Sequence, residues 1–468
     1  MNNLDQQSIF RQIPAVDLLL SRPAIASWIA CTSHEFVVTE IQRLLQEIRD
    51  AIRSGGSGST VDVSPENLEA VLVQKIQNRL RPNLRTVINA TGVILHTNLG
   101  RAPLSAAAQK SLSAFSAHYT NLEYDISSGQ RWHRDKLIEP LLREVLPCEA
   151  ATVVNNNAAA VFLILNTLAL GKEVIVSRGE LVEIGGSFRI PDILARSGAF
   201  LREVGTTNKT RLSDYQGAVG PNTALLLRVH PSNYRMSGFT ERPELSELVG
   251  LSRNAGIPLV EDIGSGCLMD IKPYGISDEP LVQESLTAGA DLVCFSCDKL
   301  MGGPQAGIIA GARKLVDPIR KNPLMRTYRV EKLIFGALEA TLGSYRFGKA
   351  ASEVPILRMI SMTRQELRKR AQSFSRRLRP RLGGDVRVRL LDGSSVVGGG
   401  SCPECRLPTT LVALESNAIR PNTIESRLRS QEPAIILRLE EDRVLIDLRT
   451  VFPSQESTLI EGLRKSIA

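Results

Sequence analysis

Apolar residues recur every three or four positions between Glu35 and Arg53, which predicts an amphipathic helix. The apolar stripe of this helix consists of Ile41, Leu44, Leu45, Ile48 and Ile52. The glycine- and serine-rich run from Ser54 to Ser59 predicts a flexible hinge after the helix. A second helix is expected from Pro65 to Arg79. We therefore expect an N-terminal helical domain with its linker over residues 1–80.

Strands and helices alternate through the middle of the chain. Short apolar runs that end in polar or glycine-rich turns predict strands at 152–154, 172–177, 223–230, 258–262, 290–296 and 306–310. Segments with helical periodicity predict helices at 158–168, 244–254 and 330–344. This alternation predicts an α/β domain over residues 81–344, with a mostly parallel sheet flanked by helices. Ligands of such sheets bind at the carboxyl ends of the strands.

The pattern changes near residue 345. A basic amphipathic helix is expected from Arg364 to Arg379, and a final helix is expected from Glu456. Between these helices, alternating apolar and polar positions predict strands at 386–391, 411–414, 434–439 and 443–447. We therefore expect a small α+β domain over residues 345–468.

The composition of the 468 residues, 43% hydrophobic and 23% charged, is typical of a globular protein. The net charge of +8 suits a polyanionic partner, although many basic enzymes bind no nucleic acid. Arg43, Arg49 and Arg53 lie off the apolar stripe of the first long helix, so they fit either a solvated face or a phosphate contact. The absence of a secretory signal and of a long apolar run predicts no membrane partner.

The seven cysteines are scattered and odd in number, which predicts reduced thiols in a cytoplasmic protein. Cys402 and Cys405 form a single CxxC pair. A structural zinc site needs four ligands and no second pair lies nearby in the sequence, so we expect no metal site.

The stretch around Lys299 is the strongest candidate for catalytic chemistry. An apolar strand precedes the lysine, and Gly302-Gly303-Pro304 follows it with a tight bend. A lysine in this setting is typical of a Schiff-base lysine, whose partly desolvated amine loses its proton and attacks a carbonyl. Asp262 ends another strand 37 residues earlier, where a carboxylate can hold the pyridinium nitrogen of pyridoxal phosphate (PLP) protonated. Either residue alone would also fit an ordinary surface position.

Two further features suit an anionic ligand. Asn155, Asn156 and Asn157 precede a helix, and a helix N-terminus is a ready phosphate site, although an asparagine N-cap is the simpler explanation. Arg326 and Arg329 are three residues apart and would share a face if they began the next helix. They could then form an oxyanion clamp, but an ordinary surface pair has the same spacing.

The chain resembles the bacterial selenocysteine synthases, the L-seryl-tRNA(Sec) selenium transferases, from about residue 10 to its C-terminus. The similar blocks are INATGVILHTNLGRAPLS, VVNNNAAAV, RGELVEIGGSFRIPDI, EVGTTNKT, VHPSNYRMSGF, VEDIGSG, DKLMGGPQAG and RVEKLIFGALEATL. The resemblance implies a PLP enzyme of the aspartate-aminotransferase fold, assembled as a homodecamer from five dimers, whose N-terminal domain binds tRNA. It further implies conversion of L-seryl-tRNA(Sec) to L-selenocysteinyl-tRNA(Sec) with selenophosphate, through a PLP-bound dehydroalanyl intermediate.

The resemblance also assigns roles to individual residues. It implies that Lys299 is the Schiff-base lysine and Asp262 the partner of the pyridinium nitrogen. It places three arginines at the selenophosphate site: Arg101, Arg326 and Arg329. We assign three further positions to the cofactor site: Asn156, Asn157 and Ser296. The freed amine of Lys299 is expected to remove the seryl α-proton.

The sequence departs from the family pattern at two places. Cys297 stands where glycine is usual, and the Cys402/Cys405 pair is normally absent. Neither change removes an expected catalytic group, and Cys297 brings a thiol near a site that handles selenium.

Two other functions remain open at this point. A PLP-dependent lyase acting on a small amino acid would share much of the catalytic domain, but it would have no need of a basic helical module. A tRNA-binding protein without catalysis would not need the pair of Lys299 and Asp262.

Overall fold

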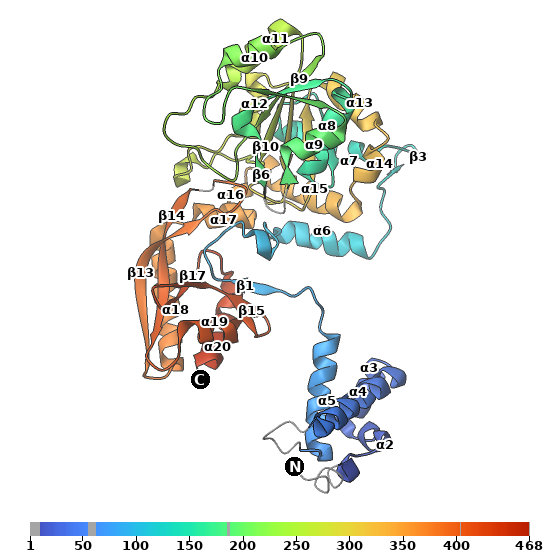
Figure 1. Ribbon diagram of the computed structural model, residues 1–468, viewed down its shortest axis with the longest axis vertical. Helices are drawn as coiled ribbons and strands as arrows, with labels where there is room; N and C mark the ends of the chain where they lie inside the picture. The colour runs from blue at the N-terminus through green and yellow to red at the C-terminus, as the bar shows by residue number, and fades with distance from the viewer. Residues whose placement is uncertain (1–9, 55–61, 185–187, 403, 468) are drawn as a thin grey trace. The chain divides into compact units, whose positions relative to one another are not determined.

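The computed structural model describes residues 10–54, 62–184, 188–402 and 404–467, and Figure 1 shows the course of the chain. The chain forms two compact units, Met1–Thr86 and Val87–Ala468. The finer division into residues 1–80, 81–344 and 345–468 stays a prediction. No helix in the described ranges is long and apolar enough to cross a membrane.

The N-terminal unit is built from helices that pack around one long helix. They are α2 (Val16–Leu20), α3 (Pro23–Cys31), α4 (His34–Arg53) and α5 (Pro65–Leu80). The side chain of Ser33 caps α4 by accepting a hydrogen bond from the Phe36 backbone N–H (3.2 Å). The predicted apolar stripe of α4 is buried. The expected hinge falls mostly on residues 55–61, which lie outside the described ranges.

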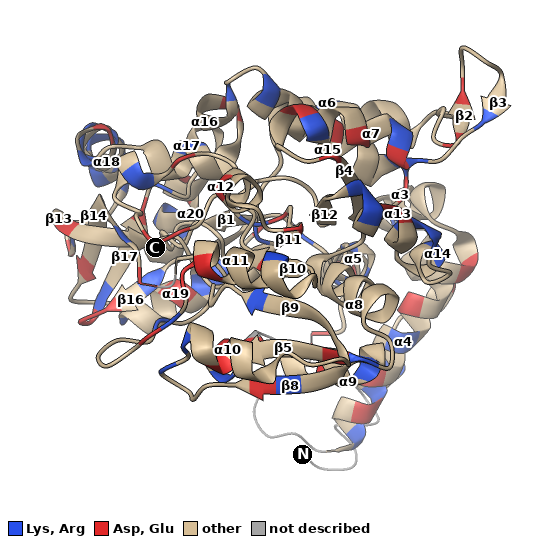
Figure 2. Cartoon of the chain, turned by 90° about the horizontal axis from the view of Figure 1, so that it is seen from above, with Lys and Arg blue, Asp and Glu red and all other residues tan. Residues whose placement is uncertain are grey.

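The polar face of α4 carries both signs of charge (Figure 2). Arg43 Nη1 lies 2.9 Å from Glu40 Oε1, and Arg53 Nη1 lies 3.5 Å from Asp50 Oδ1. Ion pairs at this spacing on an exposed helix face stabilise it by only a few tenths of a kcal/mol, on the order of 0.3–0.5. This magnitude applies to the Arg53–Asp50 pair, in which both side chains are exposed, whereas Glu40 is buried and also pairs with Arg79 (3.1 Å).

A seven-stranded sheet forms the centre of the larger unit. Its strands, in spatial order, are β4 (Ala150–Val154), β12 (Gly307–Gly311), β11 (Leu292–Ser296), β10 (Leu259–Gly264), β9 (Thr223–Val229), β5 (Glu173–Ser177) and β8 (Phe200–Val204). The strands from β11 to β8 pair in parallel, whereas β12 is antiparallel to both of its neighbours. The predicted α/β class with a mostly parallel sheet is confirmed.

Helices cover both faces of this sheet (Figure 1). One face packs against α8 (Asn157–Leu168), α9 (Ile190–Ser197) and α13 (Arg313–Lys321). The other packs against α7 (Asp135–Val145), α12 (Val282–Ala288) and α15 (Lys332–Arg346), with α10 (Leu212–Ala218) and α11 (Leu245–Ala255) further along. Because side chains alternate along a strand, Leu292 and Cys294 enter the first layer while Val293 and Phe295 enter the second. Burial on both faces explains the continuous apolar runs of these strands.

A smaller antiparallel sheet lies in the C-terminal part. It contains β13 (Val386–Val396), β14 (Arg406–Ser416), β17 (Arg443–Asp447) and β16 (Arg438–Glu440). Its core includes side chains of α18 (Arg364–Leu378), α19 (Pro421–Arg429) and α20 (Glu456–Ile467). The short strand β1 (Val87–Asn89) pairs in parallel with β15 (Ala434–Ile436). β1 lies within the predicted segment 81–344, and its partner strand lies within the predicted segment 345–468.

The remaining short elements connect these layers. They are η1 (Thr97–Leu99), α6 (Ala106–Ser116), β2 (Tyr124–Asp125), β3 (Gln130–Arg131), η2 (Arg178–Glu180), β6 (Glu183–Ile184), β7 (Phe188–Arg189), η3 (Lys272–Tyr274), α14 (Met325–Tyr328), α16 (Ala350–Glu353), α17 (Pro355–Ser361), η4 (Arg379–Arg381) and η5 (Pro453–Gln455). Arg326 and Arg329 precede α15, so the condition that they begin this helix and share one of its faces is not met. Arg326 lies within α14, and Arg329 ends that helix.

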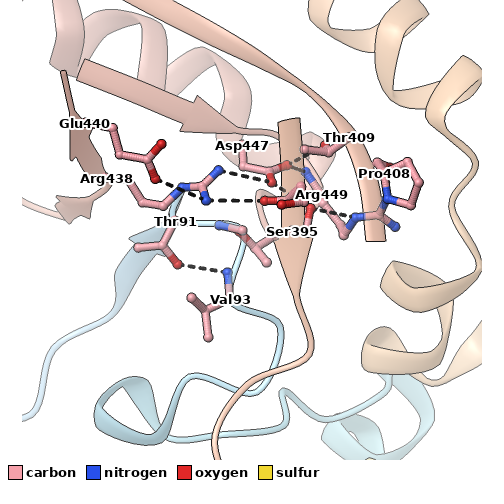
Figure 3. A network of polar contacts seen from close by, with 12 residues as sticks. Thr91, Val93, Ser395, Pro408, Thr409, Arg438, Glu440, Asp447 and Arg449 are labelled. Carbon is pink, nitrogen blue, oxygen red and sulfur yellow. Dashed lines mark hydrogen bonds and ion pairs between the residues drawn. The ribbon is translucent and has the colours of Figure 1, made fainter. Parts of the chain in front are cut away.

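Arg449 is fully buried and ties the small sheet to its surroundings (Figure 3). Its Nε donates to Ser395 Oγ (2.8 Å), its Nη1 to the Met359 carbonyl (2.6 Å), and its Nη2 to the Pro408 carbonyl (2.7 Å). Asp447 Oδ2 in turn accepts a hydrogen bond from Ser395 Oγ (2.6 Å). Buried charges are tolerated only when they are paired and hydrogen-bonded in this way.

This network fixes the loop that leaves the end of β13. The Val396 N–H donates to the Gly92 carbonyl (3.0 Å), and the Leu95 N–H donates to the Val397 carbonyl (2.6 Å). A Cβ atom at Gly92 would lie 2.2 Å from Asp447 Oδ2, so only glycine lets the backbone pass there. Backbone hydrogen bonds thus hold the segments around residues 92 and 397 against each other.

We expect Arg449→Lys to lower the free energy of unfolding by about 3 kcal/mol, because lysine cannot reproduce the planar fork and leaves buried acceptors unpaired. Chemical denaturation monitored by circular dichroism measures this loss. Arg443→Lys, which changes a partly exposed ion pair with Glu415 (3.1 Å), is the matched control and should change stability by less than about 1 kcal/mol. Equal effects of the two substitutions would contradict the role of the Arg449 network.

Candidate active site

Lys299 lies in a tight turn directly after β11, at the carboxyl end of the strand. The Leu300 N–H donates to the Ser265 carbonyl (2.9 Å), and the Gly302 N–H donates to the Lys299 carbonyl (2.9 Å), so the turn is held from two sides. The lysine is only 6% exposed. The predicted position of Lys299 at a strand end, followed by a bend, matches the structure.

Asp262 lies on β10, beside β11, and pairs in register with Cys294. It is 4% exposed, and its Oδ1 accepts a hydrogen bond from Asn157 Nδ2 (2.8 Å). The loop after β10 passes close to the end of β11. A Cβ atom at Gly266, whose φ is +67°, would lie 2.3 Å from the Ser296 carbonyl oxygen. Glycine at this position therefore allows the two strand ends to meet.

The two groups influence each other's ionisation. Burial lowers the pKa of Lys299, and the Asp262 carboxylate partly opposes this effect. Burial raises the pKa of Asp262, and the hydrogen bond from Asn157 and the charge of Lys299 act in the opposite direction. A lysine with a lowered pKa supplies a neutral amine at a lower pH, and a neutral amine is both a nucleophile and a base.

A loop from the small sheet covers Lys299. A Cβ atom at Gly400, whose φ is +85°, would lie 3.1 Å from Lys299 Nζ. The loop reaches this position through the anchored segment near residue 397. The environment of the amine therefore depends on both sheets, and the glycine allows the close approach.

The N-terminus of α8 borders the same strand ends. The Asn156 side chain caps the helix by accepting a hydrogen bond from the Ala159 N–H (2.9 Å), so the simpler explanation of an N-cap holds for Asn156. Asn157 turns its amide toward Asp262, and its Oδ1 is buried without a hydrogen-bond partner among the described residues. The structure thus brings Asn157, Asp262 and Lys299 together. Their expected contacts with a cofactor stay predictions.

Ser296 and Cys297 lie just before Asp298 and the lysine, at the end of β11. Ser296, the last residue of β11, is buried and pairs with Gly307 of β12. Cys297 is fully buried in the layer that contains Phe335 and Leu338 of α15. Burial raises the pKa of the Cys297 thiol, which keeps it protonated. The unusual cysteine therefore belongs to the hydrophobic core.

The three arginines occupy two separate places within one chain. Arg101 Nη1 lies 2.7 Å from Oδ2 of Asp298, the residue before Lys299. Arg326 and Arg329 instead line a different hollow of about 630 Å³, where Arg329 Nη1 lies 3.5 Å from Glu123 Oε1. The structure therefore brings Arg101 to the lysine, and it does not gather the three arginines around one point in the described part of the chain.

A buried carboxylate, Glu279, is a feature that the sequence did not reveal. Its Oε1 accepts a hydrogen bond from Ser265 Oγ, its Oε2 accepts one from Cys402 Sγ (3.1 Å), and His230 Nε2 lies 3.7 Å from Oε2. Burial alone would raise the pKa of Glu279, but the hydrogen bonds and the charge of His230 bring it below its ordinary value. Glu279 follows an irregular polar stretch with no motif, so no local signal could have identified it.

His230 links this group to Asp262. Its backbone N–H donates to the Asp262 carbonyl (2.8 Å), and it is the residue that follows the strand β9. The side chains of His230, Glu279 and Cys402 line a cavity of about 360 Å³, which is in the range of small-ligand pockets. No group of three or more His, Cys, Asp or Glu side chains in the described ranges is arranged to hold a metal ion.

The seven-stranded sheet covered by helices, with a buried lysine at a strand end, defines a protein of the predicted α/β class. The same fold is seen in the solved structure of D-glucosaminate-6-phosphate ammonia-lyase, with a TM-score of 0.57 and 18% identity over 84% of this chain and 98% of that one. A family model described as L-seryl-tRNA selenium transferase matches residues 87–452, and one described as selenocysteine synthase N terminal matches residues 10–49. The chain belongs to the L-seryl-tRNA selenium transferase family, as its resemblance predicted.

Similar curated proteins support this membership. The L-seryl-tRNA(Sec) selenium transferase of Geobacter sulfurreducens is 45% identical over 98% of this chain and 99% of its own length. The protein of the same name from Moorella thermoacetica is 44% identical over 99% of this chain and 98% of its own length.

We expect the Lys299 amine to titrate below the ordinary pKa of lysine, because burial disfavours its charged form. Asp262→Asn should lower this pKa further, because it removes a carboxylate that favours the charged amine. NMR of protein with isotope-labelled lysine, recorded across a pH series, measures both values, and Lys299→Arg identifies the resonance. A rise of the pKa in Asp262→Asn would contradict the coupling between these two groups.

Proposed function

We propose that this chain converts L-seryl-tRNA(Sec) to L-selenocysteinyl-tRNA(Sec), with selenophosphate as the selenium donor and PLP as the cofactor. The observation that supports this most strongly is the pair of Lys299 and Asp262, buried together at adjacent strand ends. It occurs in a chain whose curated relatives are named for this reaction and match it over nearly its whole length.

The residues present fit PLP on the chemistry of their side chains. Asn157 Oδ1 is a buried acceptor without a hydrogen-bond partner among the described residues, and it lies at the N-terminus of α8, where a phosphate is stabilised by backbone N–H groups. Lys299 offers an amine for covalent attachment, and Asp262 offers a carboxylate for a ring nitrogen. When bound, PLP supplies an electron sink that stabilises negative charge at the carbon next to an amino group.

We assign the remaining steps of the reaction to side chains of this protein. Lys299 Nζ, whose pKa is lowered by burial, accepts in its neutral form the proton from the α-carbon of the seryl group. The serine hydroxyl leaves the β-carbon as water, the selenium of selenophosphate bonds to the same carbon while the α-carbon regains a proton, and hydrolysis of the selenium–phosphorus bond releases phosphate. Selenophosphate is an anion, so we assign to its binding and orientation the three arginines that the resemblance implies, Arg101, Arg326 and Arg329, although Arg101 lies apart from the other two within one chain.

The N-terminal unit is the proposed tRNA-binding part. Its match to the selenocysteine synthase N-terminal family supports this role, and Arg43, Arg49 and Arg53 are available on α4 for phosphate contacts. We further propose that the copies assemble as a homodecamer, a pentamer of dimers, and that the reaction takes place in the cytoplasm. Analytical ultracentrifugation tests the assembly directly.

A PLP-dependent lyase acting on a small amino acid is the alternative function. The likeness to D-glucosaminate-6-phosphate ammonia-lyase concerns the fold alone at 18% identity. Absorbance spectra of the protein with PLP separate the two functions. A change with seryl-tRNA(Sec) but not with free serine supports the transferase, and the reverse result supports the lyase. A folded protein that develops no cofactor band would overturn both.

Lys299→Ala should reduce turnover of seryl-tRNA(Sec) at least about a thousandfold, because it removes both the attachment point and the base. The measurement is formation of selenocysteinyl-tRNA(Sec) from labelled seryl-tRNA(Sec) under saturating selenophosphate. Lys314→Ala, at an exposed position on α13, is the matched control and should leave turnover unchanged. Activity of Lys299→Ala near the original level would refute the assignment.

Arg326→Ala should slow selenium transfer by about a hundredfold while it affects loss of the serine hydroxyl much less, because its proposed role is to bind the anionic donor. Single-turnover assays with and without selenophosphate separate the two steps. Lys321→Ala, at an exposed position in the same region of the sequence, is the control for a general loss of positive charge. Equal losses in both steps would contradict the assignment of Arg326.

A further inference from the structure

Cys402 and Cys405 lie on the loop that covers Lys299. The loop passes the lysine at Gly400 and reaches Cys402 two residues later. Both cysteines line the cavity of about 360 Å³ that also contains His230 and Glu279. Cys402 is 6% exposed and Cys405 is half-buried. Both thiols therefore border the candidate active site.

The two cysteines are close in space as well as in sequence. The Cys405 N–H donates to the Cys402 carbonyl (3.1 Å), which closes a turn between them. Their thiols also interact: after burial and the carboxylate of Glu279, the Cys405 thiol contributes to the raised pKa of Cys402. Both cysteines are free thiols in the structure.

The other cysteines lack this arrangement. Cys267, Cys294 and Cys297 are buried in the core, and Cys31 is exposed in the N-terminal unit. Cys148 is half-buried, and burial raises its pKa to about 11. Cys402 and Cys405 thus differ from the other five cysteines in that they neighbour each other and both line a cavity.

We propose that Cys402 and Cys405 form a redox-sensitive dithiol, which a small-molecule disulfide such as oxidised glutathione converts to an intrachain disulfide with loss of activity at the neighbouring site. The pair is a modification site of this chain, and only its effect on activity rests on the proposed function.

The reaction balances as two thiol–disulfide exchanges. Burial raises the pKa of the Cys405 thiol, so the attack is favoured at alkaline pH, where the thiolate of this more accessible cysteine attacks one sulfur of the oxidant and releases one thiol. Cys402 then attacks the sulfur of Cys405, and the second oxidant thiol leaves. The Cys402 proton passes to Glu279 Oε2, which already accepts its hydrogen bond (3.1 Å), and then to water. Two protein thiols are oxidised while one disulfide is reduced to two thiols.

Oxidation changes the site in two ways. Cys402 loses the hydrogen that it donates to Glu279, so this buried carboxylate keeps only Ser265 and His230 as partners. The new bond also constrains the loop that places Gly400 against Lys299 Nζ. We expect the activity to fall about tenfold, which is the loss that corresponds to one hydrogen bond to a charged group.

The test uses the full-length protein treated with oxidised glutathione. Trypsin releases residues 390–406, a peptide that contains Cys402 and Cys405 as its only cysteines. Mass spectrometry without reductant should find this peptide lighter by two hydrogen atoms, and dithiothreitol should restore both the mass and the activity. Cys405→Ser keeps the thiol that donates to Glu279 but cannot form the disulfide, so its activity should resist the oxidant. Cys31→Ser, the matched control, should remain sensitive.

Two results would overturn the proposal. One is a peptide of unchanged mass, or one that carries only glutathione, under conditions that modify Cys31. The other is an equal loss of activity in Cys405→Ser, or a disulfide that forms without any loss. If the reduced protein shows no transferase activity, the proposed function fails, but the mass of the peptide still decides whether the dithiol exists.

Discussion

The buried amine of Lys299 is the constraint on which the rest of the site depends. An amine at 6% exposure is costly to charge, and an uncompensated buried charge costs about 3–5 kcal/mol. Asp262 and Asn157 form one side of its surroundings, and the loop around Gly400 covers another. The parallel pairing of β10 with β11 sets this geometry, because it places the ends of both strands at the same edge of the sheet.

Support for the lysine comes from parts of the chain that are far apart in sequence. Asp298 binds Arg101 beside the lysine. The covering loop is held by pairing with the segment around Leu95, and that segment is fixed in turn by the network of Asp447 and Arg449. A buried polar network of this kind specifies one arrangement, since any shift would leave several groups without partners. The geometry of the site therefore depends on segments outside the larger sheet as well as on the strands within it.

Much of the architecture could be predicted from the periods of apolar residues. The buried strands of the large sheet are continuous apolar runs, and α4 shows a clean helical stripe, so both were located within a few residues. Lys299 and Asp262 were predicted as site residues because they are polar residues at or just after the ends of predicted apolar strands. Short elements carry too few residues for a period, which is why β1 was not predicted, whereas its partner β15 falls within the predicted strand at 434–439.

The directions of the side chains at the site also could not be predicted from the sequence. Asn157 lies at a helix N-terminus, where a phosphate contact was the natural expectation, yet it turns to Asp262. The spacing of Arg326 and Arg329 suggested the first turn of α15, but the chain closes the separate short helix α14 first. Glu279 is important only through tertiary contacts with His230 and Cys402, which no local pattern encodes.

The position of Gly400 against Lys299 has a wider consequence. The covering loop belongs to the small sheet, whereas the lysine belongs to the large one, so the solvation of a single amine depends on how closely the two sheets approach each other. Any movement that draws the sheets apart would admit water to the amine and make it more basic. The protonation state of Lys299 therefore depends on the distance between the two sheets, so the reactivity of the amine is coupled to the conformation of the chain.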